Sequence, residues 1–509
     1  MPKYYPVGIQ DFDKLRSQNY VYVDKTTYVW QMAERGGYYF LSRPRRFGKS
    51  LLVSTLEYLF RGRKELFEGL YIADKWDWTQ TNPVIKISFS NIGHKDLGLY
   101  EAISRSLDQT AQKYNIELQA DFNAGQFNEL IIKLATQYGK VVILIDEYDK
   151  PIIDYLGTND AGMAKAIENR DILKSFYSIL KDADQYLKMV FITGVSKFSK
   201  VSIFSDLNNL SELSIDDRFG GICGITQTEL DSYFKEELTI FDPNKIKKWY
   251  NGYHWGLGES VYNPFSLLNF FVSGGQFKNY WFETGTPTFL INLNKKYEKY
   301  DFEYIKITAT QLSAYDIEHL QIIPLMFQTG YLTIKNYIEE DGIYELGYPN
   351  EEVRQSYLGM LADSYANSQN DPITVLATEM RDALKVADLG KVERIFNTVF
   401  KSIPYEIWQK ENEHYYHAII HLTFRLLGIY VESQVQTSDG RIDALVQLKD
   451  YVYAFEFKLD GSAEMALTQI KERGYLEPYQ NQGKICIGIG LNFSKEFKKV
   501  EKLLWEEIN

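Results

Sequence analysis

The stretch YYFLSRPRRFGKS, residues 38–50, decides the fold of the N-terminal half of the chain. Its first four residues predict a short buried strand, and residues 42–48 predict a loop that contains proline and glycine. From Ser50 to Phe60 the apolar residues have the spacing of a helix. A loop between a strand and a helix N-terminus presents backbone N–H groups that attract anions. The stretch therefore predicts a phosphate-binding loop.

Three residues at the end of this loop carry the expected chemistry. Gly48 lets the backbone approach the phosphate, Lys49 reaches the β and γ phosphates, and the hydroxyl of Ser50 binds Mg2+. Arg43 stands where the general loop pattern has its first glycine, so the match is imperfect. Gly-Lys-Ser alone occurs by chance in many proteins of this size, so the loop needs support from other motifs.

That support is the run VVILIDE, residues 141–147, an apolar strand that ends in adjacent carboxylates. A continuous apolar strand is typical of a parallel sheet buried on both faces. Asp146 would hold Mg2+ through water, and Glu147 would polarise the attacking water. The alternative is that both carboxylates only cap the following helix. Thr193, at the end of another predicted strand, and Ser196 are candidates to sense the γ-phosphate, and a structural role for them is equally open.

The predicted nucleotide-binding residues thus lie at the ends of three strands, and the expected cofactors are ATP and Mg2+. These residues are Arg45, Arg46, Phe47, Gly48, Lys49, Ser50, Leu51, Asp146, Thr193 and Ser196. Arg45 and Arg46 either contact phosphate or form solvated surface, and both interpretations stay open. Asp149 is interpreted as structural. Arg218 is a candidate arginine finger from a second copy of the chain, although one loop arginine is weak support.

A second constellation lies near the C-terminus, where Asp443 begins one predicted strand and Glu456 and Lys458 lie on the next. Residues two apart in a strand share a face, and a tight hairpin at 449–451 can bring Asp443 beside them. Carboxylate and water ligands suit Mg2+, so Asp443 and Glu456 are the predicted metal ligands. The metal would lower the pKa of bound water and clamp a phosphodiester, and Lys458 would orient the nucleophile or stabilise developing charge.

Helices on either side of these strands supply further candidates. Glu413 could complete the cation site, and Gln469 could position water or the substrate backbone. An Asp…Glu-x-Lys match alone is common in charged proteins, so the predicted α-β-β-β-α-β order supports the interpretation. His414, His417 and His421 have helical spacing and are interpreted as packed or solvated helix positions. The alternatives are a supporting role for His417 beside the Asp443 and Glu456 site and, more weakly, a separate metal site.

Composition limits the remaining classes of function. The net charge of −12 argues against a general nucleic-acid coat protein, although it leaves room for a local basic groove. Two distant cysteines, Cys223 and Cys486, suggest neither a disulfide framework nor a thiolate zinc site, and they fit a reducing cytoplasm. The N-terminus has no apolar signal-peptide core. The longest apolar runs are far shorter than the roughly 20 residues of a membrane span.

Several separated motifs resemble the AAA-ATPase-like family of prokaryotic proteins over roughly residues 4–285. They are YVDKT (22–26), FLSRPRRFGKS (40–50), LIDEYD (144–149), TGVSKF (193–198), WYNGY (249–253) and YNP (262–264). Arg43 in place of the first glycine is normal within that family, so the resemblance implies nucleotide binding despite this departure. No chemistry is evident for residues 22–26 from the sequence.

The C-terminal motifs resemble the PD-(D/E)XK nuclease superfamily, in the branch that is fused to AAA-ATPase-like domains. Residues 413–417, 440–443, 456–458 and 466–475 carry this resemblance, within about residues 390–505. It implies a DNA-directed hydrolase in mobile-element or phage-defence biology. Every acidic and lysine position of the motif is present, which favours a live site.

The expected architecture is α/β with four parts. These are a P-loop ATPase domain at 1–225, its helical lid at 226–285, a mixed α+β linking region at 286–385 and a nuclease-like domain at 386–509. The leading hypothesis is a cytoplasmic ATPase and nuclease that acts on nucleic acid, with DNA as the first choice, and that assembles into a homo-oligomer. The competing hypothesis is a nucleotide-driven switch whose nuclease-like domain only binds nucleic acid or a partner.

Overall fold

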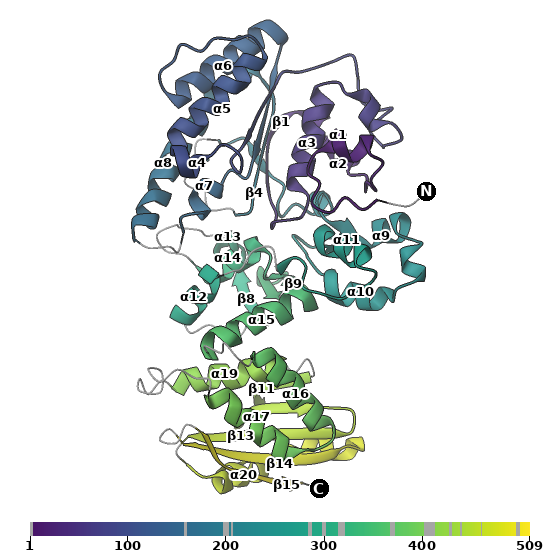
Figure 1. The fold of residues 1–509 in the computed structure, drawn as a ribbon, viewed down its shortest axis with the longest axis vertical. Helices are drawn as coiled ribbons and strands as arrows, with labels where there is room; N and C mark the ends of the chain where they lie inside the picture. The colour runs from purple at the N-terminus through teal and green to yellow at the C-terminus, as the bar shows by residue number, and fades with distance from the viewer. Residues whose placement is uncertain are drawn as a thin grey trace. The chain divides into compact units, whose positions relative to one another are not determined.

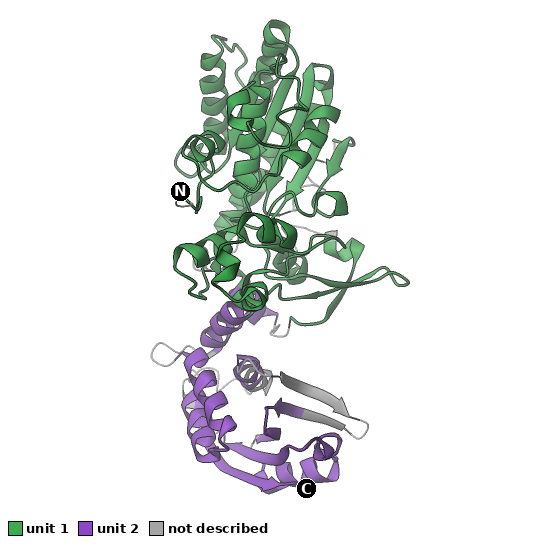
Figure 2. Cartoon of the chain, turned by 90° about the vertical axis from the view of Figure 1, so that its right-hand side faces the viewer, with its two compact units in different colours: residues 1–290, 302–354 green, residues 291–301, 355–509 purple. Residues whose placement is uncertain are grey.

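The computed structural model describes most of the chain, in two compact units (Figure 2). Unit 1 comprises residues 1–290 and 302–354, and unit 2 comprises residues 291–301 and 355–509. The described residues are 4–156, 160–196, 203–204, 207–282, 288–297, 302–313, 321–366, 372–401, 413–426, 430–437, 440–459, 461–494 and 499–508.

The core of unit 1 is a five-stranded sheet in which every pairing is parallel. Its strand order is β2 (Val84–Ser88), β3 (Val141–Asp146), β4 (Leu187–Gly194), β1 (Gly37–Ser42) and β5 (Leu210–Glu212). All six residues of β3 are buried, as a parallel strand covered on both faces requires. The predicted α/β class and the predicted strands at β1, β3 and β4 are confirmed, and the alternating apolar pattern of residues 83–89 likewise predicts β2. The short edge strand β5 was not expected.

Helices cover both faces of this sheet (Figure 1). One face carries α1 (Phe12–Ser17), α2 (Thr26–Arg35) and α3 (Lys49–Phe60), and the other carries α5 (Leu99–Lys113), α6 (Asn123–Tyr138) and α8 (Asp160–Asp182). The sequence predicted α8 only from residue 171. Its first half buries the small or polar residues Gly162, Ala166 and Asn169, which give no apolar periodicity.

The segment that the sequence predicts to be a helical lid follows the sheet. It contains β6 (Ile225–Thr226), α9 (Gln227–Tyr233), α10 (Pro243–Tyr250), β7 (Val261–Tyr262) and α11 (Pro264–Val272). Asp242 and Asn263 cap helices that begin with proline, and Thr226 forms a capping box with Glu229. The apolar faces pack into one core that includes Leu230, Ile246 and Phe270.

Residues 302–354 add a three-stranded antiparallel sheet to unit 1. Its elements are β8 (Ile305–Thr308), α13 (Ala309–Ser313), α14 (Ile322–Thr329), β9 (Thr333–Ile338) and β10 (Ile343–Gly347). Gly330 lies against the phosphate loop, because a Cβ there would stand 2.6 Å from the ring of Pro44. This segment, for which the sequence suggested no chemistry, therefore supports the loop. The predicted division into four domains stays a prediction.

Unit 2 contains a five-stranded mixed sheet of order β11-β12-β13-β14-β15. Most of α12 (Thr288–Lys296) and of α15 (Glu351–Ala366) belongs to this unit. Its other elements are α16 (Ile373–Lys385), α17 (Leu389–Lys401), α19 (Glu413–Leu426), β11 (Tyr430–Thr437), β12 (Gly440–Gln447), β13 (Tyr451–Leu459), α20 (Ala463–Glu472), β14 (Ile485–Ser494) and β15 (Lys499–Glu507). Strands β13 and β14 are parallel and the other pairs are antiparallel.

Two details of unit 2 differ from the sequence prediction. The apolar spacing of the sequence predicts a helix over residues 462–478, but α20 ends at Glu472, because Gly474 adopts a left-handed conformation (φ +58°) that terminates it. The edge strand β15 was not expected. Its exposed charged residues hide the alternation that marks a half-buried strand.

Helices α17 and α19 lie on one face of this sheet and α20 lies on the other (Figure 1). Phe455 and Phe457 of β13 face the first two helices, where they contact Phe396 and Phe424. The alternate residues face α20, and Ala454 packs there. Since successive side chains of a strand point to opposite faces, Glu456 and Lys458 share the α20 face.

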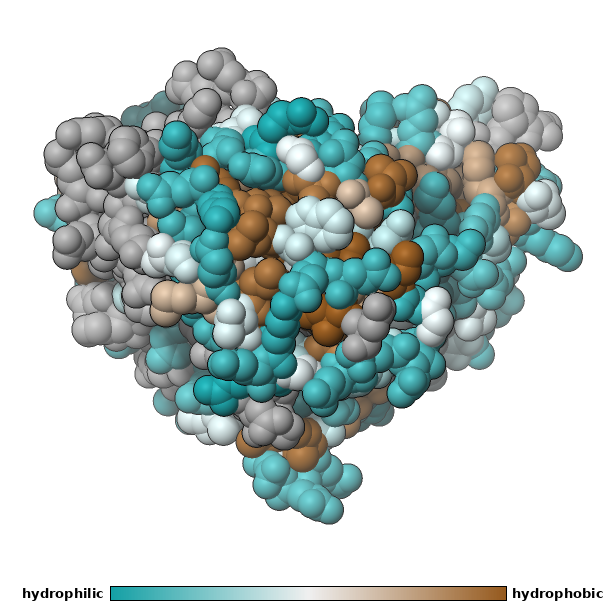
Figure 3. Space-filling model, turned by 90° about the horizontal axis from the view of Figure 1, so that it is seen from below, coloured by the Kyte–Doolittle hydropathy of each residue, from teal (hydrophilic) through white to brown (hydrophobic). Residues whose placement is uncertain are grey.

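No helix in the described ranges has the length and apolarity to cross a membrane. Hydrophilic side chains dominate the face drawn in Figure 3, with apolar residues visible between them.

Candidate functional site

The phosphate loop connects β1 to α3 and is held from inside the protein. Arg43 is buried, and its guanidinium donates hydrogen bonds to the carbonyls of Ser42 (2.9 Å) and Ser214 (2.8 Å). Gly48 has φ +94° and precedes the first residue of α3, which explains the need for glycine there. The residue that departs from the general loop pattern is therefore a structural anchor of this loop.

Lys49 folds back over the loop, where its ammonium donates to the carbonyls of Arg43 (3.0 Å) and Pro44 (2.9 Å). Burial lowers the pKa of Lys49, and the charge of Asp146 opposes this most. Phe47 does not face the phosphate cavity. Its ring packs edge-on against Tyr253 at a centroid distance of 4.8 Å, so it ties the loop to the protein.

Asp146, at the end of β3, is almost fully buried. Burial raises the pKa of Asp146, whereas hydrogen bonding with Ser50 and the charge of Lys49 lower it. Its Oδ1 atom finds no hydrogen-bond partner among the described residues. A buried carboxylate oxygen left unpaired beside a serine hydroxyl fits a Mg2+ ion, whose preferred ligands are oxygens.

Glu147 has an unusual backbone conformation for a residue with a side chain, with φ +51°. Such conformations are costly and tend to occur at functional sites. Its Oε2 accepts a hydrogen bond from the hydroxyl of Ser90, which follows β2. The side chain lines the same cavity as the phosphate loop. Ser90 was not identified from the sequence, because a lone serine after a strand gives no signal.

Thr193 and Ser196 are brought to the same sheet edge, but their hydroxyls are used inside the protein. The hydroxyl of Thr193 donates to the carbonyl of Leu41 (2.8 Å), and that of Ser196 donates to Asp149 (2.7 Å). Both residues are completely buried and neither lines the phosphate cavity. A γ-phosphate sensor role for them stays a prediction that this geometry does not support.

Asp149 holds the ends of β3 and β4 together, because it also accepts hydrogen bonds from the backbone N–H groups of Val195 and Ser196. Gly194 is required at this close approach, since a Cβ there would lie 2.6 Å from the Asp149 carboxylate. The interpretation of Asp149 as structural agrees with these contacts. Arg218 is paired with Asp216 of the same chain (2.6 Å).

The phosphate cavity encloses about 1170 Å³, part of it open to solvent, which is ample for a nucleotide. Its lining includes six of the predicted nucleotide-site residues together with Glu147. The six are Arg45, Arg46, Gly48, Lys49, Ser50 and Leu51. Three more regions were not predicted to contribute. They are the N-terminal segment with Pro6 and Gly8 to Gln10, Lys150, and helix α11 with Pro264, Phe265 and Leu268.

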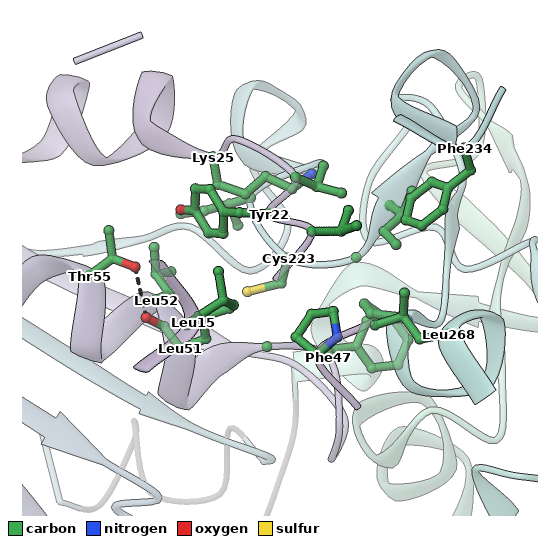
Figure 4. A pocket seen from close by; sticks show the side chains of 18 residues that line it. Leu15, Tyr22, Lys25, Phe47, Leu51, Leu52, Thr55, Cys223, Phe234 and Leu268 are labelled. Carbon is green, nitrogen blue, oxygen red and sulfur yellow. Dashed lines mark hydrogen bonds between the residues drawn. The ribbon is translucent and has the colours of Figure 1, made fainter. Parts of the chain in front are cut away.

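A second, apolar cavity adjoins the first and shares Gly48 and Leu51 with it; its empty space, part of it open to solvent, is about 630 Å³. Figure 4 shows side chains from separate parts of unit 1 converging on this cavity. Tyr22 comes from the N-terminal segment, Leu52 from α3, and Cys223 from the loop before β6. Burial raises the pKa of the Cys223 thiol, so Cys223 behaves as a small apolar residue.

Residues 22–26, which had no evident chemistry in the sequence, form part of this wall. Lys25 donates to both carboxylate oxygens of Glu229 (2.6 Å each) and to the carbonyl of Gly221 (2.7 Å). Glu229 lies on the lid helix α9. Asp24 accepts from Thr26 and from the backbone N–H of Tyr71. The motif therefore joins the N-terminal segment to the lid beside the apolar cavity.

In unit 2, the structure brings four predicted residues together on the α20 face of the sheet. Glu456 accepts hydrogen bonds from Lys458 (3.2 Å) and from Gln469 of α20 (2.5 Å). Lys458 also donates to the side-chain oxygen of Gln469 (2.7 Å). Asp443, on the neighbouring strand, accepts from the backbone N–H of Phe457 (2.8 Å).

The charges of this group are not balanced. Burial raises the pKa of Glu456 to about 7, the charge of Asp443 adds to the shift, and Lys458 opposes it. Within the part of the chain that the structure describes, the Oε2 atom of Glu456 has no hydrogen-bond partner. Two carboxylates, one of them buried with an unpaired oxygen, fit a divalent cation, which would relieve their repulsion.

Glu413 begins α19, and its side chain lies outside what the structure describes, as do those of His414 and His417. The ligand role of Glu413 stays a prediction. His421 is buried in the same helix. Among the described residues, no group of three His, Cys, Asp or Glu side chains could hold a metal ion. Of the predicted ligands in unit 2, the structure describes the side chains of Asp443 and Glu456.

Mg2+ binding to the unit 2 site should weaken roughly tenfold for each pH unit below about 7. The pKa of Glu456 is raised to about 7, so below that pH the carboxyl is protonated and must release its proton before it binds the metal. Above pH 7 the Mg2+ affinity should become nearly independent of pH. The measurement is a calorimetric titration with Mg2+ in the absence of nucleotide. Repeating it in buffers of different ionisation enthalpy gives the number of protons released per ion.

We expect roughly one proton released per ion at pH 6 and almost none at pH 8.5. The variant Glu456→Gln should bind Mg2+ more weakly and with little pH dependence. A wild-type affinity that is constant from pH 6 to 8 would contradict the assignment of Glu456 as a ligand.

Comparisons with known proteins find a family match in each of the two parts of the chain that contain these candidate sites. Residues 6–204 match the family model "Predicted AAA-ATPase" (AAA-ATPase-like), and residues 411–502 match "PD-(D/E)XK nuclease superfamily". A protein of Azotobacter chroococcum mcd 1, described as "Uncharacterized protein in vnfD 5'region", is 40% identical over 520 residues, which cover 99% of each chain. No solved structure matches the chain. These findings confirm both resemblances: the chain belongs to the AAA-ATPase-like family through its N-terminal part and to the PD-(D/E)XK nuclease superfamily through its C-terminal part.

Proposed function

We propose that the protein binds and hydrolyses ATP in unit 1 and cleaves DNA with Mg2+ in unit 2. The observation that carries the proposal is a buried carboxylate oxygen without a hydrogen-bond partner at each candidate metal site, within the described residues. These atoms are Oδ1 of Asp146, whose carboxylate bonds with Ser50, and Oε2 of Glu456, whose carboxylate is near Asp443. Unpaired buried carboxylates are costly unless a cation binds them.

In unit 1, the phosphate loop and Lys49 bind the phosphates, while Asp146 and Ser50 hold Mg2+. Glu147 polarises a water whose oxygen attacks the γ-phosphorus. The bond from that phosphorus to the β–γ bridging oxygen breaks, which gives ADP and inorganic phosphate, and the water proton passes by way of Glu147 to solvent. Mg2+ held by Asp146 and Ser50 would supply positive charge against the phosphate oxygens.

The apolar cavity beside Gly48 supports adenine as the base. Its lining is largely aliphatic, aromatic and sulfur-containing, and the ammonium of Lys25 is already bonded to Glu229 and Gly221. Guanine carries more polar groups on its edge than adenine does. Each polar group buried without a partner costs about 1–3 kcal/mol. Adenine is therefore the base that this cavity accommodates best.

ATP should accordingly bind at least about tenfold more tightly than GTP, which is the ratio that one unpaired buried polar group produces. Competition with a fluorescent ATP analogue measures both affinities. Inorganic tripolyphosphate serves as the control, because it tests the phosphate loop without a base. Equal affinities for ATP and GTP would contradict the placement of the base in the apolar cavity.

In unit 2, Asp443 and Glu456 would hold Mg2+ and Lys458 would orient the attacking water. Gln469 holds the side chains of Lys458 and Glu456 in place through hydrogen bonds. Mg2+ bound there supplies a water of lowered pKa and a positive charge against the scissile phosphate. We further propose that nucleotide state controls assembly or DNA engagement, in a cytoplasmic protein that serves mobile-element or phage-defence biology. The free, buried Cys223 and Cys486 are consistent with a reducing compartment.

The deciding experiment measures Mg2+-dependent cleavage of plasmid and linear DNA, with and without ATP, by wild type and Lys49→Ala. Cleavage by wild type supports the nuclease, and a different rate for Lys49→Ala shows that nucleotide controls it. ATP hydrolysis without cleavage of any DNA would favour the alternative, a nucleotide-driven switch whose unit 2 only binds nucleic acid or a partner.

A further inference from the structure

Lys150 is a basic residue of the phosphate cavity that the roles above do not use. It is the first residue of the short helix α7 (Lys150–Ile153), three positions after Glu147. Its backbone N–H donates to the carbonyl of Glu147 at 3.0 Å, so the two residues belong to one tight turn. The side chain lines the cavity together with Lys49 and Glu147.

The partner of Lys150 is Asp154, which lies at 3.2 Å through Oδ1 and is itself shared by other cations. Its second oxygen, Oδ2, lies 3.1 Å from the ammonium of Lys95 and 3.4 Å from Nε2 of the buried His94. Although burial alone would raise the pKa of Asp154, its contacts with His94, Lys95 and Lys150 hold that pKa well below its usual range.

This arrangement leaves Lys150 free to change partners. Asp154 keeps its ion pair with Lys95 when Lys150 moves away, so its charge is not left without a cation. A lysine side chain is long and flexible and carries three rotatable donors, so it can turn from Asp154 into the cavity that it lines. The energetic cost of the exchange is small, because Lys150 is partly exposed to solvent in its present pairing.

The position of Lys150 also indicates which phosphate it reaches. Glu147 is the residue proposed to polarise the water that attacks the terminal phosphorus, and Lys150 stands on the same turn. During hydrolysis, negative charge is spread over the oxygens of the transferring phosphoryl group. A donor held at the place where this charge develops lowers the barrier more than it strengthens ground-state binding.

We infer that Lys150 leaves Asp154 and binds the terminal phosphate of the nucleotide, as a cation supplied by the same chain that bears Glu147. The inference rests on the proposed ATP-binding function. It gives unit 1 a catalytic cation without requiring Arg218 of a second copy.

Two readouts on the full-length protein test this role. The first is the affinity ratio between adenosine 5′-O-(3-thiotriphosphate), abbreviated ATPγS, and ADP, both with Mg2+. ATPγS carries a group at the γ position and ADP does not. Lys150→Ala should therefore lower this ratio roughly tenfold or more and leave ADP binding unchanged. The second is the rate of ATP hydrolysis, which should fall by about 10²-fold, as for removal of one transition-state donor.

Matched variants separate a phosphate contact from a structural effect. Lys150→Met keeps the aliphatic stem and should behave like Lys150→Ala, whereas Lys150→Arg should recover part of the ratio and the rate. The control is Lys165→Ala on α8, since Lys165 has similar exposure and a comparable pair with Glu168 (2.9 Å) but does not line the cavity. Lys165→Ala should match wild type.

Two different failures can be told apart. Wild-type protein that binds neither ADP nor ATPγS would overturn the proposed ATP-binding function, and this inference with it. Wild-type protein that binds both, with an unchanged ratio and rate in Lys150→Ala and Lys150→Met, would overturn the role of Lys150 alone.

Discussion

Replacing Glu147 by glutamine should lower the rate of ATP hydrolysis by about 10²–10⁴-fold, because the amide cannot accept the proton of the attacking water. Nucleotide affinity should stay close to that of wild type, since phosphate binding depends on the loop around Gly48 and on Lys49. The strained backbone of Glu147 (φ +51°) and its place in the phosphate cavity support this role. Steady-state phosphate release and binding of a fluorescent ATP analogue measure the two quantities.

Two further variants serve as controls, one for a glutamate outside the cavity and one for nucleotide binding itself. Glu168→Gln on α8 is the matched control, because Glu168 is an exposed glutamate outside the cavity and should be replaceable without effect. Lys49→Ala should lose nucleotide binding itself. Hydrolysis by Glu147→Gln at the wild-type rate would show that another group activates the water.

The architecture of unit 1 was predictable because its signals are local and strong. An entirely buried strand such as β3 appears in the sequence as an unbroken apolar run. The phosphate loop lies between a strand and a helix, and the apolar patterns of these two elements show where it begins and ends. The same holds for the lid, where Asp242 and Asn263 stand directly before proline at helix starts. The edge strands β5 and β15 were not predicted, because an exposed strand needs no regular apolar pattern.

The site was less predictable, since contacts between distant segments are invisible to local patterns. The role of Ser90 depends on the neighbouring ends of β2 and β3, and the lid contributes Phe265 to the cavity across more than a hundred residues of sequence. Thr193 shows the opposite problem. Its position at a strand end suggested a sensor, but its hydroxyl already binds the carbonyl of Leu41.

Residues 22–26 show why a motif can be recognised without a mechanism. The charges of Asp24 and Lys25 gave no local reason for their presence, because their partners are Tyr71 and Glu229, far along the chain. Once folded, Lys25 is a buried cation with a carboxylate and a carbonyl as acceptors, which is how a buried charge is stabilised. Its position between the apolar cavity and the lid gives a physical route by which base binding can influence α9.

Replacing Lys458 by alanine should reduce Mg2+-dependent DNA cleavage by about 10²–10³-fold, the usual effect of removing a donor that stabilises developing charge. Lys458 contacts both Glu456 (3.2 Å) and Gln469 (2.7 Å), so its loss also removes the cation that opposes the raised pKa of Glu456. That pKa should rise above its present value of about 7, and Mg2+ binding at neutral pH should weaken.

These two effects can be separated by pH. Raising the pH to about 9 deprotonates Glu456 and should restore Mg2+ binding by Lys458→Ala, while cleavage should stay low because the donor to the reacting group is still missing. Lys391→Ala on α17 is the control, because Lys391 pairs with Glu379 (3.5 Å) on the opposite side of the sheet. Recovery of full cleavage at high pH would mean that Lys458 acts only by holding Glu456 ionised for the metal. Wild-type cleavage by Lys458→Ala at neutral pH would mean that it has neither role.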